Sequence, residues 1–152
     1  MPANNQAIID ALITAYFAEI ETVMNYIANA NNLDGVRAKH IKTSLEADVA
    51  EELGHAQLLA KRIKTIGGTV PGSEAFKAAQ RMLQPPADNT DLVSVIKGVI
   101  AAEEQAMSSY EKIIKLSDGV DYPTQDMAIT ILADEQEHRR EFVGFLKEFE
   151  KN

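Results

Sequence analysis

The sequence predicts an all-α protein, a four-helix bundle of two antiparallel hairpins joined by a long crossover. Apolar residues recur at alternating spacings of three and four along four long segments, as in helices that pack side by side. Glycine, proline and asparagine cluster between those segments. The two halves of the chain also repeat one arrangement of glutamate, tyrosine and histidine. Together these features indicate two similar hairpins related by an approximate two-fold axis.

The four predicted helices cover about residues 5–31, 36–66, 91–117 and 123–149. The short Asn31–Gly35 link makes the first pair an antiparallel hairpin, and Gly67-Gly68 is a typical C-terminal stop. Ser117-Asp118-Gly119 joins the second pair, with Pro123 as an early residue of the last helix.

The crossover between the hairpins covers residues 69–90 and is bounded by Pro71-Gly72 and Pro85-Pro86. A link of this length can run from one end of the bundle to the other, so the second and third helices are expected to be parallel. Within it, residues 73–83 are predicted to form a short helix capped by Ser73. Its inward-facing residues would be Phe76, Ala79 and Leu83.

The composition of the chain excludes or disfavours several kinds of site and function. The 152 residues are predicted to form a single domain (1–152), and without cysteine there can be no disulfide, zinc–thiolate site or iron–sulfur cluster. The net charge is −8 and the first basic residue is Arg37, which disfavours nucleic-acid binding. No apolar run approaches the ~18 residues needed to cross a membrane, and no signal peptide is recognisable. A cytoplasmic protein is expected.

Each half of the chain places a Glu-x6-Tyr pair before a Glu-x-x-His motif. The pairs are Glu19…Tyr26 and Glu103…Tyr110, and the motifs begin at Glu52 and Glu135. Each predicted apolar stripe thus contains one glutamate near its middle. A carboxylate on a buried seam is costly unless it is paired, protonated or bound to a metal. The pattern predicts a site for two metal ions formed by Glu19, Glu52, His55, Glu103, Glu135 and His138.

The predicted donors are oxygen and imidazole nitrogen without sulfur, a set that favours iron or manganese. Two metal ions per chain are expected, iron first, with manganese as an alternative and zinc able to occupy the site in vitro. Tyr26 is expected to hydrogen-bond a ligand carboxylate, whereas for Tyr110 that role and a plain core tyrosine stay open. Other charged residues near the motifs are expected at the surface: His40, Asp48, Glu51, Glu104, Asp134, Glu137, Arg139 and Arg140.

The chain resembles the ferritin-like superfamily and is most similar in pattern to bacterioferritin and its smaller relatives. The resemblance rests on Glu19…Tyr26, Glu52-Leu-Gly-His55, Glu103…Tyr110 and Asp134-Glu135-Gln-Glu-His138, together with the 63–71 exit from the second helix. It implies that Glu19 and His55 hold one iron, that Glu103 and His138 hold the other, and that Glu52 and Glu135 bridge the two.

Four differences from related families refine this resemblance. Leu53 stands where bacterioferritins carry the methionine that binds haem, so no haem is expected. Only 14 residues follow His138, too few for the fifth helix of larger ferritins, which favours a dodecamer over a 24-subunit shell. A complete ligand set within one chain differs from the starvation-induced DNA-protecting family, whose iron site lies between subunits. The cysteine-bound iron domain of rubrerythrins is missing.

The resemblance implies a ferroxidase and iron-storage protein that oxidises Fe(II) with O2 or H2O2 and deposits Fe(III) inside a homo-oligomeric shell. The alternative is a di-iron or di-manganese oxidase or peroxidase that retains its metals and stores no iron. A non-catalytic helical scaffold is the third reading.

Overall fold

The computed structural model describes residues 3–151 and contains four long helices. They are α1 (Ala3–Asn32), α2 (Ala38–Thr65), α3 (Leu92–Ser117) and α4 (Tyr122–Phe149). Within the described range there is no strand, and each helix begins and ends within three residues of its predicted bounds. The all-α bundle predicted from the apolar periodicity is therefore confirmed.

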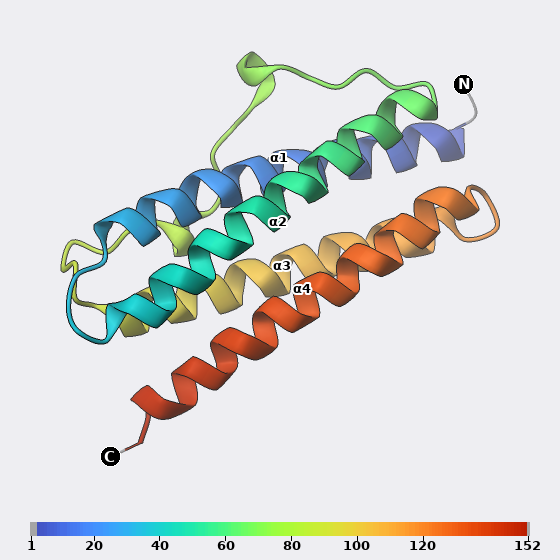
Figure 1. Ribbon diagram of the computed structural model, residues 1–152. Helices are drawn as coiled ribbons and strands as arrows, with labels where there is room; N and C mark the ends of the chain where they lie inside the picture. The colour runs from blue at the N-terminus through green and yellow to red at the C-terminus, as the bar shows by residue number, and fades with distance from the viewer. Residues whose placement is uncertain (1–2, 152) are drawn as a thin grey trace.

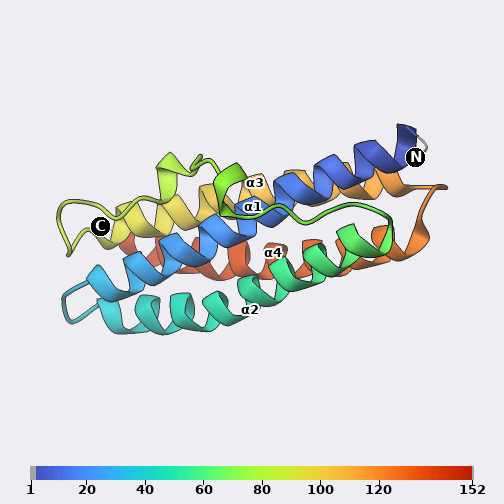
Figure 2. The same cartoon turned by 90° about the horizontal axis from the view of Figure 1, so that it is seen from above.

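The helices form two antiparallel hairpins that lie side by side (Figure 1). The pairs α1–α2 and α3–α4 make most of the contacts between helices, and α1 and α3 form the main contact between the hairpins. Figures 1 and 2 show α2 and α3 running in the same direction, with the crossover lying along the outside of the bundle. The parallel arrangement predicted from the length of the crossover is correct.

Local sequence signals account for the helix ends. Asp91 and Asp121 precede α3 and α4, and their carboxylates accept the backbone N–H of Ser94 and Thr124. Each cap satisfies an amide that has no partner within the helix. Pro123 lies in the first turn of α4, as expected. The C-terminal stop of α2 depends on Gly67, whose φ of +99° is a conformation that glycine adopts without a steric penalty.

The predicted helix over residues 73–83 is wrong. Only two short 3₁₀ turns form there, η1 (Ser73–Ala75) and η2 (Arg81–Leu83), and Ala79 is exposed rather than inward-facing. The cause lies on α1, where the buried Glu21 carboxylate accepts the backbone N–H groups of Ala79 and Gln80 at 2.8–3.0 Å. Because these amides bond to a side chain, they are not available for helical hydrogen bonds.

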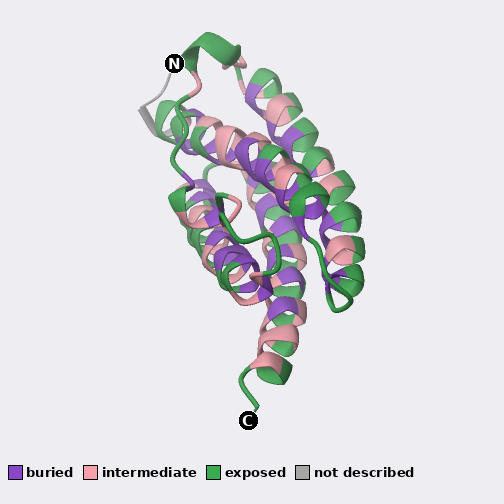
Figure 3. Ribbon diagram, turned by 90° about the vertical axis from the view of Figure 1, so that its left-hand side faces the viewer, coloured by how far each residue is buried: buried purple, intermediate pink, exposed green. Residues whose placement is uncertain are grey.

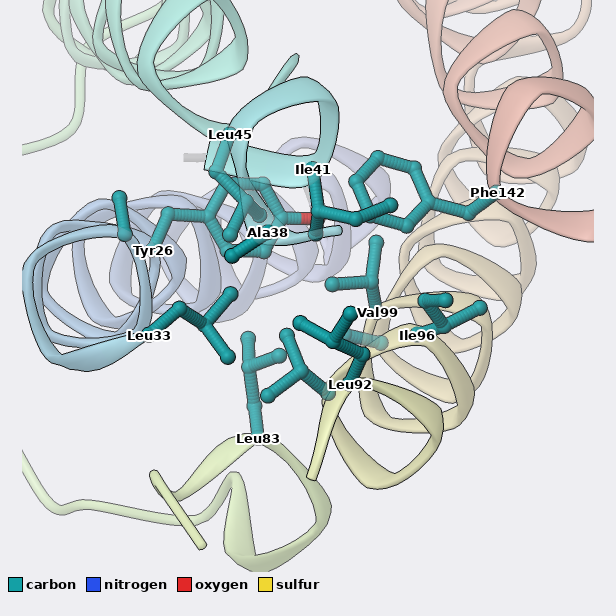
Figure 4. Close-up of a cluster of buried hydrophobic side chains, with 13 residues drawn as sticks. Tyr26, Leu33, Ala38, Ile41, Leu45, Leu83, Leu92, Ile96, Val99 and Phe142 are labelled. Atoms are coloured by element: carbon teal, nitrogen blue, oxygen red, sulfur yellow. The ribbon is translucent and has the colours of Figure 1, made fainter. Parts of the chain in front are cut away.

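Polar side chains along one edge of α1 hold the rest of the crossover in place through hydrogen bonds. The side-chain amide of Gln80 donates to the Thr22 hydroxyl at 2.7 Å and accepts from Asn25 at 3.1 Å. One turn further, Asn29 donates to the carbonyl of Leu83 at 2.9 Å. The side chain of Leu83 is thereby held inside the bundle, where Figure 4 shows it between Leu33 and Leu92.

The core consists of two apolar clusters, one toward each end of the bundle, and the buried positions follow the inner faces of the helices (Figure 3). One cluster contains Leu45, Ile96 and Phe142, and the other contains Leu12 and Ile63. On every helix the segment between the two clusters contains the predicted ligands. A polar layer therefore crosses the middle of an otherwise apolar interior.

Gly98 allows the crossover to approach α3 closely. A Cβ at this position would lie 2.4 Å from the carbonyl oxygen of Met82, so Gly98→Ala would force the crossover away from the bundle. We expect a loss of about 1–3 kcal/mol, as for other over-packed sites, and a melting temperature lower by about 2–4 °C per kcal/mol. Thermal unfolding of the metal-free protein measures this effect.

Gly144→Ala is the matched control, because Gly144 also lies within a helix and a Cβ there would meet nothing within 4 Å. Alanine at an exposed helical position is more favourable than glycine by up to about 1 kcal/mol. Equal melting temperatures for Gly98→Ala and the wild type would contradict this account of the crossover.

Candidate metal centre

The structure brings the six predicted ligands together at the middle of the bundle. All six are at least 94% buried: Glu19, Glu52, His55, Glu103, Glu135 and His138. Their ligand atoms form two groups that share Glu52 and Glu135, and within each group these atoms lie within 4.8 Å of one another. Glu19 and His55 complete one group, and Glu103 and His138 complete the other. Two positions with two common carboxylates are therefore present in one chain.

The imidazoles face this shared space through their Nδ1 atoms. Nδ1 of His55 lies 2.9 Å from Glu135 Oε1 and 3.5 Å from Glu19 Oε2. Nδ1 of His138 lies 2.9 Å from Glu52 Oε1 and 3.6 Å from Glu103 Oε1. The two rings are 6.5 Å apart and inclined at 28°. Each histidine therefore contacts a shared glutamate from the opposite hairpin.

Two tyrosines connect the hairpins across the site. The Tyr26 hydroxyl on α1 donates to Glu103 on α3, and the Tyr110 hydroxyl on α3 donates to Glu19 on α1 at 2.8 Å. Both side chains are buried, and Figure 4 shows the Tyr26 ring entering the bundle interior. The crossed pattern follows from the antiparallel direction of α1 and α3, which places each tyrosine opposite the glutamate of the other helix. Tyr110 therefore hydrogen-bonds a candidate ligand as well as packing in the core.

Three carboxylates that were not predicted as part of the site lie beside the outer nitrogens of the two imidazoles. Asp134 Oδ2 lies 2.9 Å from Nε2 of His55, and Glu51 Oε2 lies 2.8 Å from Nε2 of His138. Asp48 is also buried and lies 3.4 Å from the same Nε2 of His138. The expectation that these three carboxylates only form charged surface was wrong. A carboxylate on the outer nitrogen fixes the imidazole tautomer and directs the other nitrogen toward a metal.

The internal repeat could have indicated two of these three carboxylates as part of the site. Glu51 and Asp134 each directly precede the glutamate of a Glu-x-x-His motif, so they occupy equivalent places in the two halves. The remaining charged neighbours are exposed or partly exposed, and the ion pairs Arg139–Glu104 and Arg140–Glu137 lie at the surface. His40 is exposed as well.

Burial and mutual contacts shift the pKa values of the carboxyl groups in the site. Burial and the nearby Glu52 raise the pKa of Glu19, and burial and contact with Glu103 raise the pKa of Glu135. Burial opposes ionisation of Glu52, but interactions with Glu19 and His138 lower its pKa. Burial of this cluster therefore favours the protonated form of Glu19 and Glu135 over the ionised form.

The imidazoles carry the compensating positive charge. Burial alone would lower the pKa of His55, but contacts with Glu135 and Glu19 raise it well above its ordinary value. Contacts with Glu103 and Glu52 likewise overcome burial and raise the pKa of His138. These contacts favour the protonated form of both rings when no metal is bound.

The donor atoms fit a pair of divalent cations. One oxygen of each of the four glutamates and Nδ1 of each histidine are buried without an aligned hydrogen-bond partner. Leaving such an atom unsatisfied costs about 1–3 kcal/mol, so six of them around one space are explained well by cations that they would coordinate. Carboxylate oxygen and imidazole suit iron and manganese.

Comparison with known proteins agrees with this geometry. Residues 9–152 match the family model described as a ferritin-like domain. The chain belongs to the ferritin-like family. It is 30% identical over 144 residues to the DNA protection during starvation protein of Pyrococcus furiosus, covering 93% of this chain and 77% of that protein. It is also 27% identical to the bacterial ferritin of Neisseria meningitidis, over 88% of this chain and 81% of that protein.

Solved structures show the same ferritin-like fold. A bacterioferritin-related dodecameric thioferritin from Bacteroides fragilis has a TM-score of 0.85 and 26% identity, covering 95% of this chain and 87% of that one. A ferritin-like di-iron-carboxylate protein from Bacillus anthracis has a TM-score of 0.84 and 22% identity, covering 96% and 99%. No described helix of this ferritin-like chain is long and apolar enough to cross a bilayer.

Asp134→Ala tests the support of the imidazole in this ferritin-like site. Without its partner at 2.9 Å, His55 loses the interaction that orients the ring, and we expect metal affinity to fall by about 10–100-fold. Co(II) or Zn(II) titration under anaerobic conditions measures it. Glu137→Ala is the control, because Glu137 is exposed and pairs only with Arg140. An equal loss in both variants would point to general surface charge instead.

Metal loading should also release protons. Because the pKa values of both imidazoles and of Glu19 and Glu135 are raised before metal binds, two divalent cations should displace protons from the site at neutral pH. The raised imidazole pKa values mean that protons compete with metal, so affinity should fall as the pH is lowered. Anaerobic Zn(II) addition in weakly buffered solution with a pH indicator measures the release. Release of no protons, with binding intact, would contradict this charge balance.

Proposed function

We propose that this protein is a ferroxidase that binds two Fe(II) ions in one subunit, oxidises them with O2 or H2O2 and passes Fe(III) to a mineral inside an oligomeric shell. The observation that carries the proposal is the pair of buried ligand groups sharing Glu52 and Glu135. Membership of the ferritin-like family and the relatives named as ferritins support it.

In this proposal Glu19 and His55 hold one Fe(II), Glu103 and His138 hold the other, and the two shared glutamates bridge them. Four carboxylates neutralise two divalent ions, so loading requires no net charge in the bundle interior. Tyr26 and Tyr110 keep the terminal glutamates in place through their hydroxyl groups. The support from Asp134 and Glu51 keeps Nδ1 of each histidine directed inward.

Two iron ions held together can deliver two electrons in one event. Two Fe(II) and two protons reduce O2 to H2O2, or reduce H2O2 to two water molecules, and in both reactions two Fe(III) are formed. Oxidation in pairs avoids one-electron radical products.

Self-association into a shell is part of the proposal. Several large apolar side chains are about half exposed on the helices and would be available to pack against other subunits. They are Met24, Ile27, Leu58 and Ile129. The similar protein from Bacteroides fragilis is described as a dodecamer, and we favour a dodecamer here.

Adjacent glutamates offer a matched test of the metal site. Glu103 is buried among the candidate ligands, whereas its neighbour Glu104 is exposed and pairs with Arg139. Glu103→Ala should reduce the rate of Fe(II) oxidation by more than the roughly 10–100-fold expected for residues that only support a ligand. Glu104→Ala should keep the wild-type rate. The appearance of Fe(III) absorbance in the near ultraviolet measures both.

Aerobic Fe(II) titration of the metal-free protein, combined with light scattering after size exclusion, tests the storage role. Oxidation well beyond two Fe per chain in a large particle is the expected result. Uptake that stops at two per chain in a small oligomer would overturn storage and favour the alternative, a di-iron or di-manganese oxidase or peroxidase that retains its metals.

A further inference from the structure

A cavity of about 340 Å³ lies between α1, α3 and the crossover, and Glu19 forms part of its wall. Small side chains from the two helices line its sides, notably Ala18, Ala102 and Ala106. Four residues of the crossover border it: Ala75, Lys77, Ala79 and Gln80. The cavity therefore reaches from the surface to one of the candidate metal ligands.

The cavity extends across the approximate two-fold axis, because the equivalent residues Ala18 and Ala102 both line it, but beyond it the crossover fills the groove between α1 and α3. Leu83 is buried in the core there, and the carbonyl of Met82 lies directly over Gly98. Gln80, bonded to Thr22 and Asn25, separates the filled part from the open part. Of the two terminal glutamates, Glu19 but not Glu103 lines the open part.

The cavity lies on the α1–α3 side of the metal centre, whereas the carboxylates that contact the outer nitrogens of His55 and His138 lie on the α2–α4 side. Asp48, Glu51 and Asp134 are supplied by α2 and α4 and would attract cations. Apart from Glu19, the one carboxylate lining the cavity is Glu21, and its oxygens already accept three hydrogen bonds from backbone N–H groups. Among the described residues five alanines line the cavity, most of its other side chains are uncharged, and Lys77 is its one basic residue. Such a lining suits a small uncharged molecule rather than an ion.

We propose that this cavity admits dioxygen to the metal position bounded by Glu19 and His55, an inference that rests on the proposed ferroxidase function. Dioxygen is apolar and uncharged, and it takes one electron from each of two Fe(II) ions and two protons from solvent to leave as H2O2. Glu21 acts as a positioning residue, because its bonds to Ala79 and Gln80 hold the crossover at the rim of the cavity.

The test fills the cavity from two opposite walls. Ala18→Leu on α1 and Ala106→Leu on α3 each add a branched side chain at a half-buried lining position. Ala7→Leu, at an exposed position on α1 outside the cavity, is the matched control. For each purified oligomer the measurements are thermal unfolding, anaerobic Co(II) binding, xenon density in pressurised crystals and the rate of Fe(II) oxidation by O2.

We expect xenon in the cavity of the wild type and of Ala7→Leu, and none in Ala18→Leu or Ala106→Leu. Oxidation by O2 should be severalfold slower in the two filled variants, with Co(II) binding unchanged. Wild-type oxidation rates in variants that exclude xenon would overturn the proposal, as would absence of xenon from the wild type. Failure of the ferroxidase function is recognised separately, since the wild type would then bind Co(II) without oxidising Fe(II).

Discussion

The electrostatic cost of four buried carboxyl groups governs the rest of the structure. Four negative charges in one apolar interior would repel one another and destabilise the bundle. In the metal-free protein the raised pKa values of Glu19, Glu135 and both histidines favour proton uptake, which moves the site toward neutrality. Two divalent cations would restore the same neutrality with four carboxylates and two neutral imidazoles. Either metal ions or protons can therefore offset the negative charge of the buried carboxylates, and the fold is compatible with both.

The same constraint explains why the hairpins are joined at the site itself. The helices α2 and α4 touch only slightly, so most contact between hairpins comes from α1 and α3. There the hydrogen bonds from Tyr26 to Glu103 and from Tyr110 to Glu19 connect the two halves. Each shared glutamate also contacts the histidine of the opposite hairpin. The polar layer therefore sets the register of the bundle while the apolar clusters on either side supply most of the buried surface.

Much of this arrangement could be predicted from the sequence because it depends on local periodicity. A helical spacing places Glu19 and Tyr26 on one stripe, and the repeat in the second half predicts their counterparts. The helix predicted between residues 73 and 83 failed because Glu21, distant in sequence, captures the amides of Ala79 and Gln80. Asp134 and Glu51 were misassigned for a similar reason. Their partners, His55 and His138, lie on the opposite hairpin, and only the packing of α2 against α4 reveals them.

The crossover is the element that breaks the two-fold symmetry of the site. A bundle of two equivalent hairpins would present two equivalent metal positions, but a single chain can join them by only one link. That link lies across α1 and α3, enters the core with Leu83 beside one position and leaves a cavity beside the other. The polar edge of α1 that holds it, from Glu21 to Asn29, has no counterpart in the repeat on α3. Two positions with the same ligands therefore differ in their surroundings, and a reaction that needs both can begin at one of them.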